Sequence, residues 1–316
     1  MKTVKTMEWL VKREFWEYKG MFFLAPVRLG LLMITLLVGI LIYSGGRNMN
    51  FNIQGAPHII EHRTELVTTI ANNYIAASIP IFLMLSVMVF FYCLGAMFEE
   101  RRDRSILFWK SLPVSDTATV MSKVSLALVV APLIGIAVGF VTSFVMLMII
   151  SVVMAFQGMN FLGALFSNGD LYLTPLRLIG MWPVYVLWAI PTVGWLLMVS
   201  AWARSKVFLW AVGMPVLALI IVKMADYAFK LNINMDWVFQ NVFMRVLGGL
   251  FPGIWLTSQD ATRIVNMGQF QTGSDIANSF TIAWMSLTDA GMWGGVVAGS
   301  LMIFTAIKLR RWRDEA

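Results

Sequence analysis

Charged residues are scarce in this chain of 316 residues, and their scarcity indicates its class. Only 13% of the residues are Asp, Glu, Lys or Arg, whereas 59% are hydrophobic. A soluble globular domain carries a charged fraction nearer one quarter, so an ordinary soluble protein is excluded. The composition predicts an all-α integral membrane protein, because apolar segments cross a bilayer as helices whose backbone groups bond internally.

Cysteine is almost absent, since Cys93 is the only one and lies within an apolar run. An intramolecular disulfide is therefore excluded. A cleavable signal peptide is not expected either, because the first 20 residues mix five basic with three acidic side chains and lack a continuous apolar core.

The net charge of +7 comes from basic residues that flank apolar runs. This placement indicates membrane topology and not binding to nucleic acid.

Two further absences concern the energy source. The sequence has no G-x-x-x-x-G-K-[ST] phosphate-binding motif, so no ATP site or other cofactor, and no enzymatic activity, is predicted for this chain. Ionisable residues in the predicted spans are limited to Arg28 and Lys223, both near span ends. Proton and sodium carriers commonly place carboxylates or histidines in mid-membrane, so their scarcity favours a protein driven by a separate partner.

The hydrophobic pattern divides the chain into one transmembrane domain. Residues 4–19 have helical amphipathic spacing and are expected to lie in the membrane interface, with Trp9 and Trp16 at headgroup level. Within the outer loop at 226–289, the stretch 237–256 contains Arg245 and several glycines, which favours a re-entrant or interfacial hairpin over a full crossing. The six spans are predicted at residues 26–44, 75–98, 124–155, 178–203, 207–222 and 290–307.

The basic residues predict which side is cytoplasmic. Of 24 Lys and Arg residues, 17 lie on the side of the two termini and seven on the other. The acidic residues divide nine to eight, so the asymmetry is specific to Lys and Arg. Because basic residues concentrate on the cytoplasmic side, both termini are predicted to be cytoplasmic.

A charged segment at residues 99–123 separates two long apolar runs and is the main surface available to a soluble partner. It contains five basic and four acidic residues beside aromatic and proline side chains, a mixture that can bind another protein. The three arginines nearest the preceding span are also suited to anionic lipid headgroups. The candidate partner-binding residues are Glu99, Glu100, Arg101, Arg102, Asp103, Arg104, Trp109, Lys110, Leu112, Pro113, Asp116 and Lys123.

Two stretches carry a family resemblance, KREFWEYKGMFFLAP at residues 12–26 and FYCLGAMFEERRDRSILFWKSLPVSDTATVMSK at residues 91–123. Both resemble the membrane subunit of bacterial ABC-2 type ABC transporters. The resemblance implies a six-span permease that works as an exporter in the inner membrane and pairs with a second permease subunit. It also implies cytosolic ATPase subunits that bind ATP and Mg²⁺. Residues 4–19 would then form the connecting helix, residues 99–104 the cytoplasmic end of span two and residues 111–123 the coupling helix.

Glycines spaced four apart occur in spans three and six and permit close helix approach. The contact could lie within one subunit or between two subunits. These helix-packing candidates are Gly135, Gly139, Gly291, Gly295 and Gly299.

Two other functions remain open. His58, Glu61 and His62 match the H-x-x-E-H pattern of a zinc peptidase. A third ligand is needed, however, and the next carboxylates after Glu65, those from Glu99 to Asp116, are predicted to lie across the membrane, so no metal site is assigned. The other alternative is a membrane scaffold that binds a soluble partner without transport.

The topology makes a testable prediction. Cysteines introduced at Ser167 and Thr272 should react with an impermeant maleimide in intact cells, whereas a cysteine at Ser115 should react only after permeabilisation. Reaction of the Ser115 cysteine from outside would contradict the six-span topology.

Overall fold

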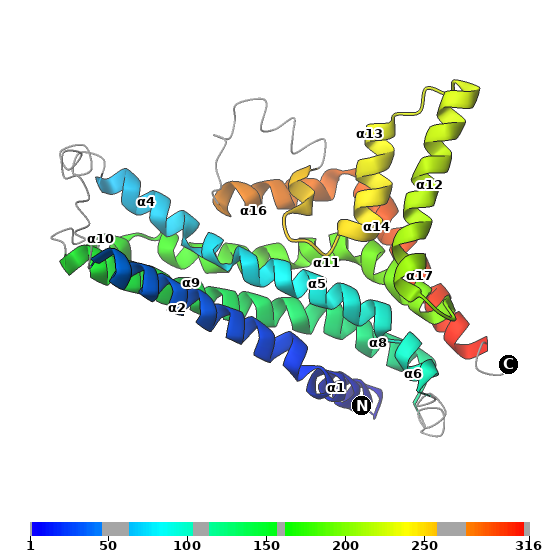
Figure 1. Ribbon diagram of the computed structural model, residues 1–316, viewed down its shortest axis with the longest axis horizontal. Coiled ribbons are helices and arrows are strands. Elements are labelled where there is room, and N and C mark those ends of the chain that lie inside the picture. The colour runs from blue at the N-terminus through cyan, green and yellow to red at the C-terminus, as the bar shows by residue number, and fades with distance from the viewer. Residues whose placement is uncertain (1, 46–62, 104–113, 157–161, 258–275, 313–316) are drawn as a thin grey trace.

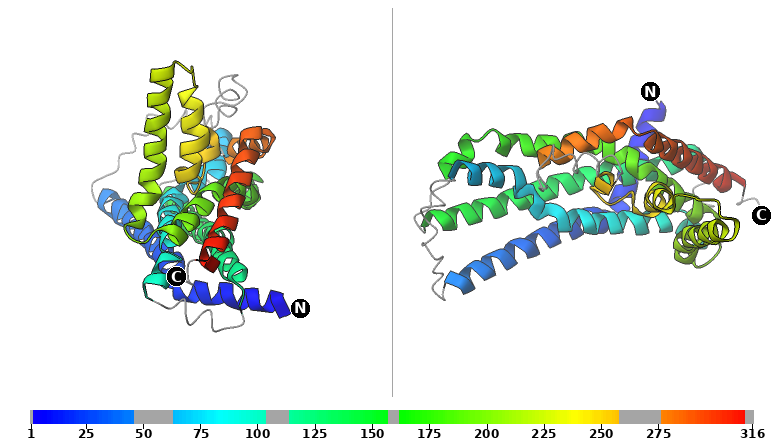
Figure 2. Two further views of the ribbon diagram at one scale, coloured as in Figure 1. Left: turned by 90° about the vertical axis from the view of Figure 1, so that its right-hand side faces the viewer. Right: turned by 90° about the horizontal axis from the view of Figure 1, so that it is seen from above.

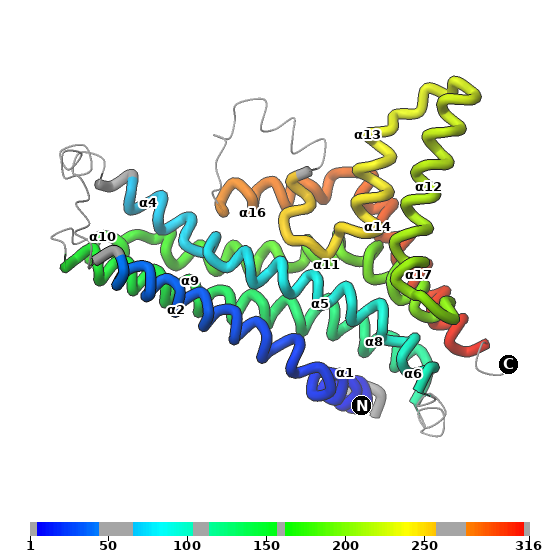
Figure 3. The backbone as a smooth tube through the Cα atoms, in the orientation of Figure 1, coloured from blue at the N-terminus to red at the C-terminus, as the bar shows by residue number. Residues whose placement is uncertain are grey.

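A computed structural model describes residues 2–45, 63–103, 114–156, 162–257 and 276–312. Every regular element in these ranges is a helix, as the composition predicts. Several helices follow one another without a break in direction, joined by short 3₁₀ or π-helical turns (Figure 3). In order, the α-helices are α1 (Lys2–Glu17), α2 (Ala25–Gly45), α4 (Arg63–Asn73), α5 (Ile79–Gly95), α6 (Phe98–Arg102), α8 (Asp116–Ser125), α9 (Ala131–Phe156), α10 (Leu162–Ser167), α11 (Asp170–Trp202), α12 (Val207–Phe229), α13 (Met235–Val238), α14 (Met244–Gly248), α16 (Ile276–Met285) and α17 (Ala290–Trp312).

Six helical runs in the described part of the chain are long and apolar enough to cross a membrane. Their order agrees with the sequence, but most of them are longer than predicted because the helices continue into charged residues at their ends. The largest difference is in the second run, which begins at Leu66 and not near residue 75, and the third run begins at Asp116 and not near residue 124. The six runs are Gly20–Tyr43, Leu66–Arg102, Asp116–Phe156, Asp170–Trp202, Val207–Phe229 and Ala290–Trp312.

The long helices form an elongated bundle in which α2, α5, α9 and α11 run side by side (Figure 1). Helices α4 and α10 lie at one end of the bundle, whereas α1, α6 and the C-terminal end of α17 lie at the other (Figure 2). The N-terminal and C-terminal helices therefore share one end of the bundle with α6 and the start of α8, the described helices of the charged segment. This arrangement agrees with the even number of crossings read from the sequence.

Helix α11 is the most buried span, and α17 packs along it. Two glycines allow this contact: Gly194 of α11 faces the carbonyl oxygen of Gly299, and Gly299 faces Ile190 and Pro191. A Cβ at Gly299 would lie 2.7 Å from backbone atoms of both residues, closer than van der Waals contact permits. The glycines of span three face α5 and the turn before it, where Gly135 meets Leu85 and Gly139 meets Ser78.

The segment predicted as a loop at 226–289 is largely helical where it is described. Helix α12 extends to Phe229, beyond the predicted end of span five, and the chain then reverses at Lys230 and Asn232, which have positive φ angles. The Asp226 carboxylate stabilises the reversal by accepting the Ile233 N–H at 2.8 Å. Helices α12 and α13 consequently lie antiparallel and project from the bundle (Figure 2).

The stretch 237–256, for which the sequence suggested a hairpin, is helical as far as Gly248 and then turns back against the bundle. Gly253 has a φ of +86°, a conformation that side-chain-bearing residues rarely adopt. The carbonyl oxygen of Leu250 is 2.7 Å from the Ser86 hydroxyl and 3.2 Å from the Tyr185 hydroxyl, so spans two and four hold this turn.

The contact of α11 with α17 gives a matched test. We expect Gly299→Ala to lower the free energy of unfolding by about 1–3 kcal/mol, because the new methyl group meets backbone that has little freedom to move. Gly294→Ala, on the same helix, meets nothing within 4 Å and should leave the stability unchanged or slightly raised. Unfolding by denaturant titration in detergent micelles measures both, and equal effects would contradict the close contact.

Candidate functional site

Five charged side chains from four helices meet at the end of the bundle that holds the chain termini. Helix α1 supplies one, α6 one, α8 two and α17 one, so residues far apart in sequence are joined. We call this group the terminal charge cluster. Its members are Glu14, Glu100, Asp116, Lys123 and Arg310.

Lys123 lies at the centre of the terminal charge cluster and is only 2% exposed. Its Nζ is 3.0 Å from Glu14 Oε1 and 2.9 Å from Glu100 Oε1, so one ammonium group joins α1 to α6. Glu14 also accepts a hydrogen bond of 3.0 Å from the Tyr92 hydroxyl. These bonds satisfy an ammonium and a carboxylate that would be costly to bury alone.

Arg310 forms the second link of the cluster. One of its terminal nitrogens lies 2.7 Å from Glu100 Oε2, and its Nε lies 3.2 Å from Asp116 Oδ1. Asp116 is the first residue of α8, where its negative charge is favourable near the helix N-terminus. Ser115 caps the same helix by accepting the Ala118 N–H. Glu100 is thus shared by both cations, so the cluster joins the ends of spans two, three and six to α1.

Arg101 makes a neighbouring connection. Its guanidinium donates to the carbonyl oxygens of Ser200 and Ala203, which lie at the C-terminal end of α11. The Ser200 hydroxyl in turn accepts the backbone N–H groups of Met97 and Phe98, each at 3.1 Å. Span four is therefore bound to span two beside the terminal charge cluster.

The residues selected from the charged segment lie in three settings. Glu100, Arg101, Asp116 and Lys123 make the internal contacts described above. Glu99, Arg102 and Asp103 are exposed, and Arg102 pairs with Asp103 at the surface. Five selected residues lie outside the described residues, namely Arg104, Trp109, Lys110, Leu112 and Pro113.

The described part of the predicted coupling helix is also part of span three. Helix α8 begins at Asp116 and continues through a π-helical turn at Leu126–Val130 into α9. Residues 114–115, which precede it, are extended or irregular, and 104–113 lie outside the described residues. A force on this end of α8 therefore acts directly on a span.

Sequence reasoning missed Glu14 and Arg310 as site residues. Both were counted only as charges at the membrane surface. The signal for Glu14 was its position four residues from Leu10 and four from Tyr18, which places a carboxylate within the apolar stripe of α1.

Burial, with added repulsion from Glu17 and Glu99, raises the pKa of Tyr18, so its hydroxyl stays neutral beside the cluster.

A second buried charge, Arg245, lies between α14, α11 and α17. Its guanidinium stacks 4.2 Å from the centre of the Trp188 ring and donates to the Gly291 carbonyl oxygen. Asp289 lies 3.7 Å away and is its ion-pair partner. A Cβ at Gly295 would lie 2.8 Å from the guanidinium, so this glycine makes room for the arginine.

Metal binding finds no support in the described part of the chain, which contains no group of three or more His, Cys, Asp and Glu side chains arranged to hold an ion. The pattern formed by His58, Glu61 and His62 lies outside the described residues.

Comparisons with protein-family models, curated proteins and solved structures find no match for this chain.

Lys123 provides the sharpest test of the cluster. We expect Lys123→Met to lower the free energy of unfolding by about 3–5 kcal/mol, because it leaves the carboxylates of Glu14 and Glu100 buried without their shared cation. Adding Glu14→Gln should recover part of this loss, since one of the two charges is then removed.

The matched control is Arg102→Met, which breaks an ion pair at the surface and should change the stability by less than about 0.5 kcal/mol. Unfolding in detergent micelles measures all of these variants. An effect of Lys123→Met no larger than that of the control would show that the cluster does not stabilise this end of the bundle.

Proposed function

We propose that this chain is the membrane-spanning permease subunit of an ABC-2 type ATP-driven transporter. In this proposal it works as an exporter in the bacterial inner membrane, together with a second permease subunit and separate cytosolic ATPase subunits that bind ATP and Mg²⁺. One observation carries the proposal: α6 and α8, the described helices of the charged segment, meet at the terminal charge cluster, which joins three spans and α1.

The cluster supports a coupling role because it is formed at α6 and α8, the two described helices of the charged segment. Exposed residues follow α6 at Asp103 and precede α8 at Ser115. A soluble protein bound there would act on the ends of spans two and three directly. A movement of these span ends would reach span six through the Glu100–Arg310 ion pair. It would reach α1 through Lys123, which pairs with both Glu100 and Glu14.

Helix α1 supports the same assignment. It lies across the end of the bundle, packed against α8, and exposes Trp9 and Trp16 (Figure 1). Exposed tryptophans beside the first span suit the membrane interface, where the indole has one apolar and one polar side. A helix of this kind, bonded to span three through Glu14, fits the connecting helix that the sequence resemblance implies.

The internal contacts determine which substitutions test coupling cleanly. Asp116→Arg would place a second cation against Arg310 and disturb the cluster itself. Within the described residues, the Asp103 carboxylate pairs with the exposed Arg102 and not with a member of the cluster, so Asp103→Arg changes the surface charge and leaves the cluster in place.

The proposal predicts that an ATPase co-purifies with the chain and that the charged segment holds it. Trp109→Ala and Asp103→Arg should each weaken ATPase binding about tenfold or more, because an aromatic anchor typically carries 2 kcal/mol or more of an interface. Trp312→Ala removes an exposed tryptophan at the same end of the bundle and serves as the control.

Co-purification followed by ATP hydrolysis assays measures the effect, and size-exclusion chromatography checks that each variant remains folded. Wild-type ATPase binding by both Trp109→Ala and Asp103→Arg would contradict the coupling role. Capture of a partner without nucleotide-binding motifs would favour the scaffold instead.

A further inference from the structure

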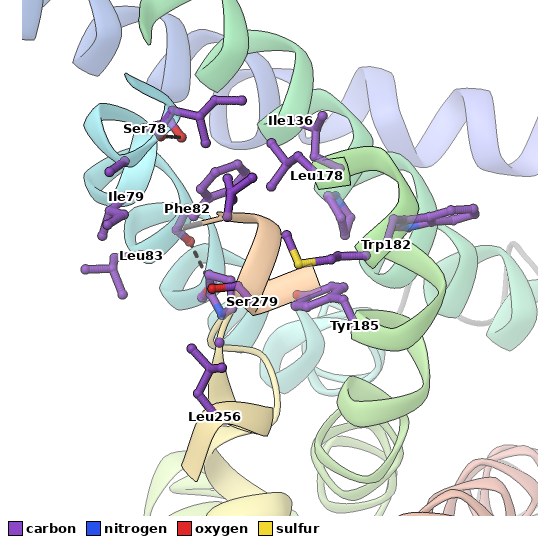
Figure 4. A pocket seen from close by; sticks show the side chains of 18 of the residues that line it. Ser78, Ile79, Phe82, Leu83, Ile136, Leu178, Trp182, Tyr185, Leu256 and Ser279 are labelled. Atoms are coloured by element: carbon purple, nitrogen blue, oxygen red, sulfur yellow. Dashed lines mark hydrogen bonds between the residues drawn. The ribbon is translucent and has the colours of Figure 1, made fainter. Parts of the chain in front are cut away.

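A cavity of about 280 Å³ lies in the middle of the bundle. It is lined by α5, α9, α11, α16, the end of α4 with the turn that follows it, and the turn at residues 252–256, with Phe82, Ile136, Tyr185 and Ser279 among its lining residues (Figure 4). Leu85, Ile136 and Tyr185 each lie next to the midpoint of their helical run. The cavity is therefore at the depth of the hydrocarbon core, if the three runs cross a bilayer.

The polarity of the lining limits what the cavity can hold. None of the described lining residues is charged. Most lining hydroxyl and N–H groups already have protein partners: Ser78 donates to Ile75, Trp182 donates to Leu128, and Ser86 and Tyr185 bond to Leu250. A charged ligand would lose its hydration and find no counter-ion here.

Trp255 has a buried donor that lacks such a partner. This lining residue is 5% exposed, and its indole N–H has no hydrogen-bond partner within the part of the chain that the structure describes. A buried donor without an acceptor costs about 1–3 kcal/mol. This N–H has almost no accessible surface, so an oxygen atom of a bound ligand would reach it once neighbouring side chains shift, and would then recover that cost.

The opening of the cavity indicates the route of entry. Ile79 and Leu83 stand four residues apart on one face of α5, and Leu256 lies on the neighbouring turn (Figure 4). All three are exposed and apolar, so the opening faces the side of the bundle. A molecule dissolved in the membrane would reach the cavity without crossing water.

We propose that this cavity binds a neutral molecule with a long apolar chain and a hydrogen-bond-accepting carbonyl oxygen, such as a fatty ester. A free ester and the acyl-ester region of a membrane lipid share this chemistry. The assignment deepens the proposed function by naming a substrate class, and only the transport step rests on that function. Binding itself depends on the cavity alone.

The test uses the full-length chain in detergent micelles and a photoreactive probe, the methyl ester of a C16 fatty acid with a mid-chain diazirine. We expect saturable labelling of residues on α5 or α11, and at least about fivefold weaker labelling with the corresponding free carboxylate. Ser279→Phe, which fills the cavity, should reduce labelling about fivefold or more. Trp255→Phe, which keeps the ring but loses the donor, should reduce it roughly two- to tenfold.

Two control variants match these substitutions. Ser300→Phe and Trp312→Phe make the same changes at exposed positions of α17 that do not line the cavity, and both should label like the wild type. Equal labelling by Trp255→Phe and Trp312→Phe, or by Ser279→Phe and Ser300→Phe, would overturn the proposal. So would equal labelling by the ester and the carboxylate.

Competition identifies the source of the ligand. Displacement of the probe by unlabelled phosphatidylethanolamine assigns the site to a membrane lipid, and displacement by unlabelled methyl ester alone assigns it to a free molecule. Displacement by neither would overturn the site. Specific labelling without a co-purified ATPase would support the binding site and contradict the proposed transporter function. An active ATPase complex without specific labelling would support the transporter function and contradict the binding site.

Discussion

Burial of Lys123 between two carboxylates is the interaction on which this end of the bundle depends. A lone ammonium at 2% exposure would be too costly to keep charged, so Glu14 and Glu100 must stay close to it. That requirement places α1 against α8 and fixes α6 at the end of span two. Arg310 of α17 is held in the same way, because it pairs with the Glu100 carboxylate that also binds Lys123. The ends of three spans therefore keep their relative positions through charge as well as apolar packing.

The bundle combines two kinds of contact that differ along its length. In the middle, α11 and α17 approach through glycines, and their contact depends on shape. At the end that holds the termini, the helices are joined instead by ion pairs and by hydrogen bonds to the carbonyl groups at helix ends. The apolar contact excludes substitutions that add volume, whereas the polar contact excludes those that leave a charge unpaired. The cavity lies in the first region, where a neutral molecule meets no charged side chain of the described lining.

Much of the fold could be predicted from the sequence, because apolar runs of this length have few alternatives to membrane-spanning helices. The order of the six runs follows from the pattern, and so does the break after Gly248. The ends of the runs could not be predicted, since Asp116 and Lys123 were assigned to a coupling helix between the spans and not to span three itself. Their charges are accommodated in a helix by Arg310 and Glu14, which are about 110 or more residues away in the chain. Long-range pairing of this kind leaves only a weak trace in a single sequence.

The π-helical turn at Leu126–Val130 determines which side of span three is turned inward. In an uninterrupted α-helix, Lys123 and Gly135 would point about 120° apart, because each residue adds about 100°. A π-helical turn takes up one additional residue and removes roughly 90–100° of that difference. Lys123 and Gly135 are thereby brought to nearly the same face, toward α6 and α5 respectively. Span three is thus a helix with a built-in change of phase, and one widened turn lets a single surface carry both a charge and a close glycine contact.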